Sequence, residues 1–356
     1  MTLKMTQVVS VKGNPFECGR QHGTQARERI RANTGTYFRR WEAMWGLKKA
    51  EIIEKCHKLV PIIGNYDADI LEELKGIANG SDLPLEEIVA LNARYERMFG
   101  KEGCTSIAAL PDVTGNGHTY IGMNWDNAPF LREFLIVLNV EQTRKPKVIG
   151  VTEAGCVGLR GMNSAGLGVC VNALVSNLDK FDIKVPFFIM FRKALNQDNF
   201  ARSLKVVMQT KLAASINLLF AHKDGEAIDL EVTPGDVGIV QEEGGILTHS
   251  NHFLALNNRP DLKDILRELC PSTLFRYRRA RHLLVKDKGK IDVTDFQRAF
   301  RDHFSYPNSI CLHPDPEDDE LNQVETLMSI IMDLNEGTMH IAEGNPCEND
   351  YLKLTL

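Results

Sequence analysis

The sequence predicts an α+β fold in which a helical first third precedes a strand-rich remainder. Apolar residues recur at helical spacing before position 103, and strand-like patterns begin at Cys104. Further along, groups of strands alternate with groups of helices, which is typical of stacked sheets covered by helices. No linker rich in Pro, Gly or Ser divides the chain, so we expect residues 1–103 and 104–356 to form one compact domain together.

The individual elements follow from hydrophobic periodicity and turn residues. We expect helices at 67–77, from Pro84 through Ile88, Leu91, Tyr95 and Met98, at 187–195 and at 200–208. We expect strands at 119–125, 134–140 and 148–152, on both sides of Asp224-Gly225, and in a final hairpin across 335–337. Asn116-Gly117 is a hairpin-turn signal, and a hairpin there would bring Cys104 close to Asp126.

Composition narrows the functional classes. The 356 residues are 43% hydrophobic and 25% charged with a net charge of -5, so a substantial core can form and nothing favours a nucleic-acid partner. The densest basic cluster, residues 276–281, is interpreted as the solvated face of a helix. No apolar run approaches the roughly 18 residues needed to span a bilayer, and no secretory signal opens the chain. We therefore expect a cytoplasmic protein with reduced thiols and no membrane partner.

The eight cysteines predict neither a disulfide framework nor a metal site. They are scattered and form no C-x-x-C pair, so we expect no zinc and no cofactor. His249 and His252 could bind a metal, but they lack a thiolate or carboxylate at ligand spacing and are interpreted as polar loop residues. Cys311 and His313 would share one face of an extended segment, yet a papain-like site would need a histidine from elsewhere in the fold.

The segment Gly103-Cys104-Thr105-Ser106 lies where the helical third meets the strands. If the peptide bond before Cys104 is cut, the cysteine gains an α-amine that can act as a base for its own thiol. An amine with a pKa near ~7.7 to 8.0 and a thiol near ~8.5 can exchange a proton at neutral pH. The alternative is that Cys104 is simply a small buried apolar residue at the start of a strand.

Several separated segments decide between these alternatives. They share order and approximate spacing with one family and comprise residues 13–19, 22–23, 74–78, 91–94, 124–126, 152–155, 163–166, 248–252 and 306–311. Through them the chain resembles the acyl-coenzyme A:6-aminopenicillanic acid acyltransferase family, a branch of the N-terminal nucleophile (Ntn) hydrolases. The resemblance implies a four-layer αββα sandwich, with residues 1–103 as a helical pro-segment and 104–356 as the catalytic core.

The resemblance also implies roles for three residues. Cys104 is the nucleophile after cleavage between Gly103 and Cys104, Asp126 orients the new α-amine, and Asn251 donates to the oxyanion. A carboxylate holds and tunes an ammonium group, and an amide stabilises an oxyanion without changing the charge of the site. Without the resemblance, Asp126 would be interpreted as a turn or capping residue and Asn251 as a loop residue that bonds its own backbone.

Two positions depart from the expected patterns. The family's arginine after the S-I-C segment is Leu312 here, so His313, Arg160 or another cation takes its place, or activity is altered. A vacant arginine position predicts that Leu312→Arg raises amide turnover or processing. Related bile-salt hydrolases usually carry an arginine where this chain has Met123, and a methionine there suits an apolar acyl pocket or ordinary core filling.

The sequence thus predicts a self-processing N-terminal cysteine amidohydrolase that acts on a linear amide or acyl thioester through an acyl-enzyme. Asn124 is a further accessory candidate, and Trp125 joins Met123 as a candidate pocket residue. After cleavage the two chains would stay together as a heterodimer. The alternatives are an acyl-coenzyme A-dependent N-acyltransferase of the same fold, and a catalytically silent homologue that binds an acylated small molecule.

Overall fold

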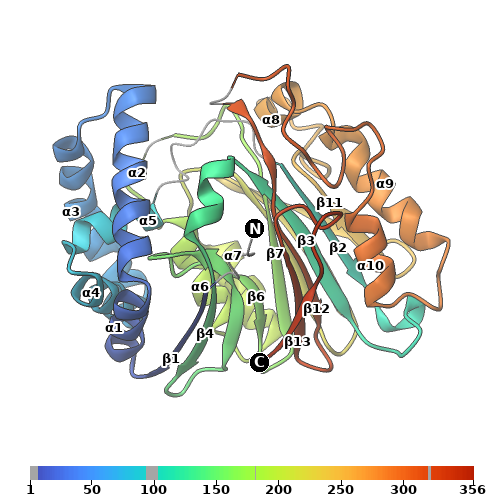
Figure 1. Cartoon of the computed structure of the whole chain (residues 1–356), viewed down its shortest axis with the longest axis horizontal. Coiled ribbons are helices and arrows are strands. Elements are labelled where there is room, and N and C mark those ends of the chain that lie inside the picture. Colours follow the sequence, from blue (N-terminus) through green and yellow to red (C-terminus); the bar gives the residue numbers. More distant parts are fainter. Residues whose placement is uncertain (1–6, 94–102, 181, 320–321) are drawn as a thin grey trace. The chain divides into compact units, whose positions relative to one another are not determined.

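The computed structural model of the chain describes residues 7–93, 103–180, 182–319 and 322–356 (Figure 1). The chain divides into two compact units. The first unit comprises Met1–Met98, Glu133–Ala165 and Lys180–Ala213, and the second comprises Phe99–Arg132, Gly166–Asp179 and Ala214–Leu356. The expected single compact domain of residues 1–103 and 104–356 stays a prediction. In the described ranges, no helix has the length and apolar character that a membrane span requires.

The first unit combines helices with strands. Strand β1 (Gln7–Gly13) pairs in parallel with β4 (Leu135–Gln142), and β4 is followed in the sheet by β5 (Val148–Glu153) and β6 (Arg160–Asn163). Its helices are α1 (Pro15–Gln25), α2 (Arg27–Trp45), α3 (Lys49–Tyr66), α4 (Ala68–Ser81), α5 (Leu85–Asn92), α6 (Phe187–Leu195) and α7 (Phe200–Gln209). The region before Cys104 is therefore largely helical, but β1 ties its beginning to a strand that lies after Cys104.

Glycines let two of these helices approach closely. A Cβ atom at Gly19 of α1 would lie 1.9 Å from the carbonyl oxygen of Glu73, and one at Gly76 of α4 would lie 2.2 Å from that of Phe16. Only glycine leaves room for such backbone contact. Glu73, buried by this packing, forms an ion pair with the fully buried Arg192 of α6 at 2.9 Å. The helices of the first unit are thus fixed to each other through both shape and charge.

The second unit stacks two sheets. One contains β11 (Ile246–His249), β2 (Gly103–Ala109), β3 (Tyr120–Asn127), β12 (Glu325–Asp333), β13 (Thr338–Glu343) and β14 (Leu352–Thr355), in that order. The other strands of the unit are the antiparallel neighbours β7 (Leu167–Ala173), β8 (Ile216–His222), β9 (Glu226–Thr233) and β10 (Asp236–Gln241). Ser106 of β2 donates a hydrogen bond to Asn172 of β7 at 2.8 Å, so these sheets face each other.

Helices cover the other face of the β2–β3 sheet (Figure 1). They are α9 (Thr273–Val285) and α10 (Val293–Phe300), and α8 (Ile265–Leu269) precedes them. Ala280 and Leu284 of α9 pack with Phe296 and Phe300 of α10 against the apolar side chains of the sheet, among them Ile107. The second unit is therefore layered as helices, sheet and sheet, and the predicted α+β class is confirmed.

Most elements with a strong local pattern are confirmed. The predicted helices at 187–195 and 200–208 are α6 and α7, and the predicted strands at 119–125, 134–140 and 148–152 are β3, β4 and β5. Asp67 caps α4 by accepting from the backbone N–H of Ile70 at 3.1 Å. The helix expected from Pro84 is α5, and its continuation to Tyr95 and Met98 lies outside the described residues.

Candidate active site

The register of two neighbouring strands places the predicted cleavage site beside the predicted acid. In the antiparallel pair β2 and β3, Gly103 lies opposite Asp126, and Cys104 lies opposite Trp125. Cys104 is 3% exposed and Asp126 is fully buried. A Cβ atom at Gly103 would lie only 2.7 Å from Oδ2 of Asp126, so the carboxylate rests directly against the glycine. The predicted closeness of Cys104 and Asp126 is thus confirmed.

Asn251 contacts the nitrogen that cleavage would convert into an α-amine. The backbone N–H of Cys104 donates to Oδ1 of Asn251 at 2.8 Å, and Nδ2 of Asn251 donates to the carbonyl of Ala173 at 3.0 Å. This orientation of the amide is fixed by chemistry, because an N–H needs an acceptor and a carbonyl needs a donor. Thr273 holds the loop by accepting from the backbone N–H of Asn251 at 2.7 Å. In the uncleaved chain Asn251 therefore orients the Cys104 nitrogen.

Arg276 is a functional candidate that the sequence interpretation missed. Its Nη1 atom donates to the carbonyl oxygen of Cys104 at 2.7 Å and to Oγ1 of Thr105 at 2.8 Å. Its Nη2 atom donates to Oδ1 of Asn251 at 2.8 Å, and Nη1 lies 4.0 Å from Oδ2 of Asp126. One buried guanidinium thus connects the predicted nucleophile, amide and acid.

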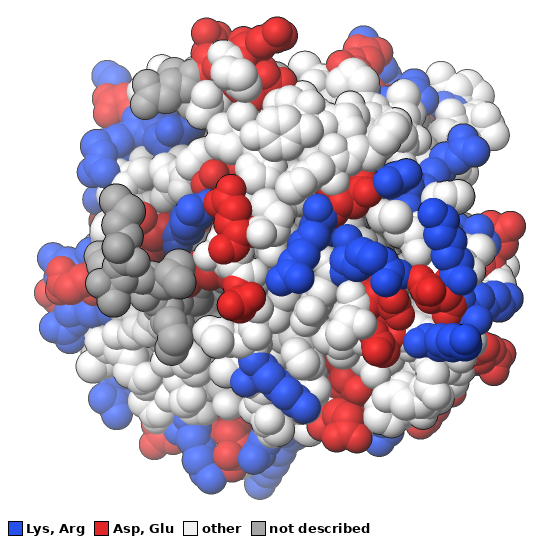
Figure 2. Space-filling model, turned by 45° about the vertical axis from the view of Figure 1, so that its right-hand side comes forward, with Lys and Arg blue, Asp and Glu red and all other residues white. Residues whose placement is uncertain are grey.

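The interpretation of residues 276–281 as a solvated face was wrong for Arg276, which is fully buried. Arg276, Ala280 and Leu284 are spaced four residues apart and form the buried side of α9, whereas Leu274 is 48% exposed. The neighbouring Arg279 instead forms an ion pair with Asp302 at 2.8 Å. Figure 2 shows basic and acidic side chains interspersed on the face that it presents. The four-residue spacing of Arg276 from Ala280 and Leu284 was the available signal that Arg276 is buried. The charge of arginine favoured an exposed position instead.

Burial and an incomplete set of hydrogen-bond donors within the described part of the chain leave the Asp126 carboxyl able to bind a further cationic group. Burial raises the pKa of its carboxyl to about 6, while Arg276 and a hydrogen bond from Thr326 oppose that rise. Oδ1 accepts the Thr326 hydroxyl at 2.7 Å, whereas Oδ2 accepts no hydrogen bond among the described residues. A buried oxygen without a donor is costly unless a partner arrives. A new ammonium group beside Gly103 would be such a partner.

A second buried charge cluster supports the loop that carries Asn251. His249 lies at the end of β11, fully buried, with Nε2 3.0 Å from Oε1 of Glu231 and 3.7 Å from Oδ2 of Asp229. Burial alone would lower the pKa of His249, but the two carboxylates raise it to about 9. Glu231 also accepts the backbone N–H groups of Leu254, Ala255 and Leu256.

This cluster changes the interpretation of the histidines. His249 is not a polar loop residue, as the sequence suggested, because it is a buried strand residue that forms ion pairs. His252 does lie in the following loop, where its Nδ1 atom contacts the Thr273 hydroxyl at 2.9 Å. Burial and nearby cations lower the pKa of His252 to about 4. The sequence could not show this difference, because Asp229 and Glu231 are distant along the chain.

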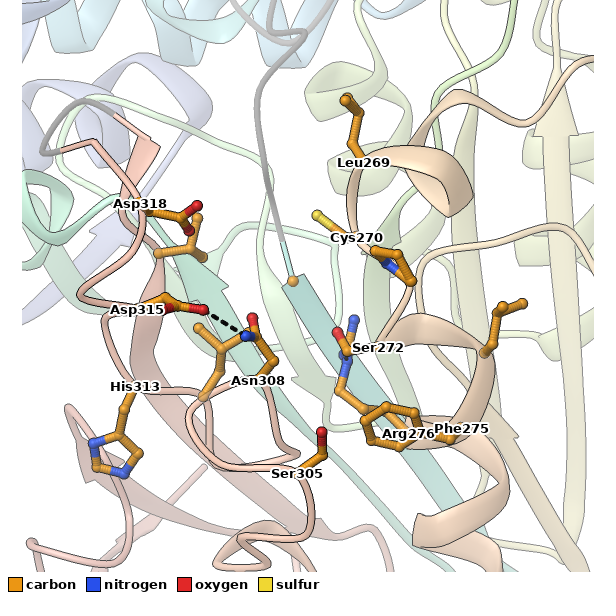
Figure 3. A pocket seen from close by; sticks show the side chains of 15 residues that line it. Leu269, Cys270, Ser272, Phe275, Arg276, Ser305, Asn308, His313, Asp315 and Asp318 are labelled. Carbon is orange, nitrogen blue, oxygen red and sulfur yellow. Dashed lines mark hydrogen bonds between the residues drawn. The ribbon is translucent and has the colours of Figure 1, made fainter.

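A pocket of about 530 Å³ reaches the cleavage site from the solvent side of the second unit. Figure 3 shows its two walls, one formed by residues 269–276 and the other by the segment that contains Ser305, Asn308 and Asp315. Apolar side chains from both walls and Gly103 line it, including Leu269, Leu274, Phe275, Leu312 and Val324. Its size falls within the range of about 300 to 1,000 Å³ that is typical of small-molecule sites.

Leu312 and His313, two residues that the sequence analysis discussed, both line this pocket. The backbone N–H of Leu312 donates to Oγ1 of Thr326 at 3.0 Å, and its apolar side chain contributes to the pocket wall. Nε2 of His313 faces Cys311, Cys347 and His303. Arg276 is a buried cation that contacts Cys104, and whether Leu312→Arg raises amide turnover or processing stays a prediction.

The remaining candidates occupy other places. Arg160 is the first residue of β6 and belongs to the first unit, whereas Cys104 belongs to the second. The suggested part of Arg160 in the Cys104 site stays a prediction. Asn124 donates from Nδ2 to the carbonyl oxygens of Phe300 and Ile310, both at 2.9 Å, which is an anchoring role. Met123 and Trp125 are buried in β3 and do not line the pocket at Gly103. Their part in a substrate pocket stays a prediction.

Comparisons with known proteins show which family the chain belongs to. A sequence model of the family described as acyl-coenzyme A:6-aminopenicillanic acid acyl-transferase matches residues 113–348. The chain is also 31% identical over 310 residues to the 40 kDa form of acyl-coenzyme A:6-aminopenicillanic-acid-acyltransferase from Emericella nidulans, covering 85% of this chain and 84% of that protein. The chain belongs to this family.

Other relatives of this acyltransferase-family chain are similar over shorter or more divergent stretches. An N-acylethanolamine-hydrolyzing acid amidase from Caenorhabditis elegans is 30% identical over 141 residues, which cover 37% of this chain and 39% of the relative. A solved structure of a conjugated bile acid hydrolase variant from Clostridium perfringens is 15% identical, with a TM-score of 0.49. The match covers 71% of this chain and 97% of the hydrolase. The family itself rests on the sequence model and the Emericella nidulans relative.

Proposed function

We propose that this acyltransferase-family protein cleaves itself between Gly103 and Cys104 and then acts as an N-terminal cysteine amidohydrolase on a linear amide. One arrangement carries the proposal. The backbone N–H of Cys104 donates to Asn251, and Asp126, whose Oδ2 accepts no hydrogen bond from the part of the chain that the structure describes, rests against Gly103. These are the groups that a newly formed α-amine would require.

Processing would begin with the Cys104 thiol attacking the Gly103 carbonyl carbon. The C–N bond breaks, the acyl group moves to sulfur as a thioester, and the nitrogen becomes an amine. Water then hydrolyses the thioester, which releases the Gly103 carboxylate and restores the thiol. Asn251 already accepts from the nitrogen that becomes the amine, and Asp126 can stabilise its protonated form.

Turnover would use the same residue twice. The α-amine takes the thiol proton as sulfur attacks the substrate carbonyl, and then gives it to the leaving amine. The acyl group stays on Cys104 as a thioester until water accepts it. Arg276 holds the Cys104 carbonyl and the Asn251 amide, so the groups around the reacting sulfur and nitrogen are positioned before substrate arrives. Asn251 is proposed to donate to the oxyanion after the amine forms.

The pocket supports an acyl group as the part of the substrate that is recognised. Gly103 lines the pocket together with apolar side chains such as Leu269 and Phe275, so an acyl chain could lie along these side chains with its carbonyl near the cleavage site. The family match favours the transferase as the second candidate, because the Emericella nidulans relative is named as a coenzyme A-dependent acyltransferase. In that case an amine, rather than water, would accept the acyl group from Cys104.

The test is to incubate purified protein with a long-chain N-acyl amide and an acyl-coenzyme A, quench with acid, and map the acylated residue by mass spectrometry. An acyl thioester on Cys104 as the new N-terminal residue would support the proposal, and free acid or a new amide would distinguish hydrolase from transferase. A Cys56→Ser variant, which changes a cysteine of α3 in the first unit, should acylate normally, whereas Cys104→Ala should not. No acyl adduct with either substrate would favour the silent acyl-binding homologue.

A further inference from the structure

Four metal-binding side chains converge in the second unit, and one of them, His313, also lines the pocket at Gly103. They form the Cys2His2 cluster, defined as His303, Cys311, His313 and Cys347, and their ligand atoms all lie within 4.8 Å of one another. The Sγ atoms are 3.5 Å apart and the two Nε2 atoms are 3.2 Å apart. Nε2 of His313 lies 3.6 Å from Sγ of Cys311 and 3.4 Å from Sγ of Cys347.

These separations match those of ligands around one tetrahedral ion. Zinc binds sulfur at about 2.3 Å and imidazole nitrogen at about 2.0 to 2.1 Å, which places two sulfurs about 3.8 Å apart, two nitrogens about 3.3 Å apart, and sulfur and nitrogen about 3.6 Å apart. The printed sequence shows why no motif reveals the site, since the ligands are separated by seven, one and 33 residues. We propose that the Cys2His2 cluster binds a single zinc ion.

The choice of zinc follows from the donor set. Thiolates and imidazoles in a tetrahedral S2N2 arrangement favour zinc, whereas magnesium and calcium prefer oxygen ligands. Four protein ligands leave no open position, which is typical of a structural rather than a catalytic zinc site. Cys311 is fully buried, His313 is 9% exposed and His303 is the outermost ligand. The site is therefore closed on the protein side and accessible from His303.

Surrounding hydrogen bonds hold Cys311 and the backbone of His313 in place. Nδ2 of Asn345 donates to Sγ of Cys311 at 3.7 Å and to the carbonyl of Leu312 at 2.8 Å. The backbone N–H of Cys311 donates to the carbonyl of Asp302, and that of His313 donates to the carbonyl of Pro307. Such outer contacts orient metal ligands and raise metal affinity. The loop between α10 and β12 is thereby joined to the segment after β13.

Zinc at this position would stabilise one wall of the pocket. Leu312, which lies between two of the ligands, donates its backbone N–H to Thr326, and Thr326 donates to Asp126. Ser305 and Asn308, on the same loop as His303, also line the pocket. The proposed ion would thus fix the segment that positions the catalytic acid. Metal binding itself does not depend on self-processing, so each proposal can fail without the other.

The sequence analysis expected no metal because the cysteines form no C-x-x-C pair. The structure brings Cys311 and Cys347 together through folding instead. Their Sγ separation of 3.5 Å leaves a disulfide between Cys311 and Cys347 as the competing use of the same side chains. A papain-like use of Cys311 with His313 is less suited to the geometry, because the Cys311 thiol is fully buried.

The test is to purify the full-length chain without a polyhistidine tag, under reducing conditions, and to measure bound metals by plasma mass spectrometry. We expect one zinc per chain. Cys347→Ser and His303→Ala should each lower the metal content at least about tenfold. Cys270→Ser and His282→Ala, which change a cysteine and an exposed histidine outside the cluster, should retain zinc.

Two further measurements keep the test decisive if a variant fails to fold. Wild-type protein treated with a zinc chelator should unfold at a lower temperature and recover when zinc is restored. Cobalt added after chelation should give the intense visible bands and thiolate charge-transfer band of a tetrahedral S2N2 site. A wild-type chain that binds neither zinc nor cobalt with its thiols reduced, or that contains a Cys311–Cys347 disulfide, would overturn the proposal.

Discussion

Asp126 should cost the uncleaved chain stability at neutral pH, because its carboxyl is fully buried and the nearby Arg276 offsets only part of the loss of contact with water. The carboxyl pKa rises from 3.8 to about 6 through burial. A group whose folded pKa exceeds its unfolded value stabilises the protein only below the unfolded value, and this contribution is lost as pH rises through the folded pKa. The rise corresponds to roughly 3 kcal/mol at pH 8, at about 1.36 kcal/mol per unit.

The perturbation is Asp126→Asn, made in a Cys104→Ala background so that the single and the double variant both remain uncleaved. An amide has the shape of the neutral carboxylic acid, so it should remove the charge with little change in packing. The double variant should be more stable than Cys104→Ala by up to about 3 kcal/mol at pH 8 and by only about 1 kcal/mol at pH 4.5, where the unfolded carboxyl is itself partly protonated.

Urea unfolding followed by fluorescence and circular dichroism at both pH values would measure this difference. Asp112→Asn in the same background is the matched control, because Asp112 is exposed and its loss should leave stability nearly unchanged at either pH. A double variant that is less stable than Cys104→Ala at pH 8, or that gains equally at both pH values, would refute the burial argument for Asp126.

Three further predictions concern the neighbours of this carboxyl. Gly103→Ala should slow self-processing about 10²-fold in time-course gels, because the new Cβ would displace the Asp126 carboxylate. Arg276→Lys should lower amide turnover at least about 10²-fold in steady-state assays, since one ammonium cannot reproduce the forked contacts of the guanidinium. Asp229 and Glu231 raise the pKa of His249 to about 9. The stability contribution of His249 should therefore be present below pH 6.5 and lost as pH rises through about 9. His249→Gln should remove this alkaline loss in pH-dependent thermal unfolding.

Each of these predictions has a control and an opposing outcome. Gly35→Ala, whose new Cβ would meet only the end of Arg39 at 3.4 Å, should process normally, and normal processing by Gly103→Ala would contradict the contact argument. Arg278→Lys, on the exposed side of α9, should keep wild-type turnover. Unchanged turnover in Arg276→Lys would limit that residue to a structural role. An alkaline loss that persists in His249→Gln would show that other groups cause it.

The sequence predicted the elements whose information is local. The helices α6 and α7 and the strands β3, β4 and β5 carry their own periodicity and turn signals, and their predicted and observed bounds nearly coincide. The strand β1 was missed because its pairing is not local: its partner β4 lies more than 100 residues later. Helical content before Cys104 was correctly anticipated, and the described helices of this region all lie in the first unit, together with later segments of the chain.

For the site, motif resemblance supplied what chemistry alone could not. Cys104, Asp126 and Asn251 were singled out by the family pattern, and the structure brings all three together. Arg276 was misread because arginine is usually exposed, and only its contacts with Cys104 and Asn251 explain its burial. The Cys2His2 cluster escaped notice for a related reason, since four scattered ligands have no local signature until the chain folds.

Self-processing at Cys104 is the central claim, and the denatured intact mass of freshly purified protein tests it most directly. We predict two chains of about 11.6 and 28.4 kDa, in proportion to residues 1–103 and 104–356 of the 40.0 kDa whole, with the larger beginning at Cys104. Cys104→Ala should remain at 40.0 kDa. A wild-type chain that stays at 40.0 kDa throughout prolonged incubation would contradict the account.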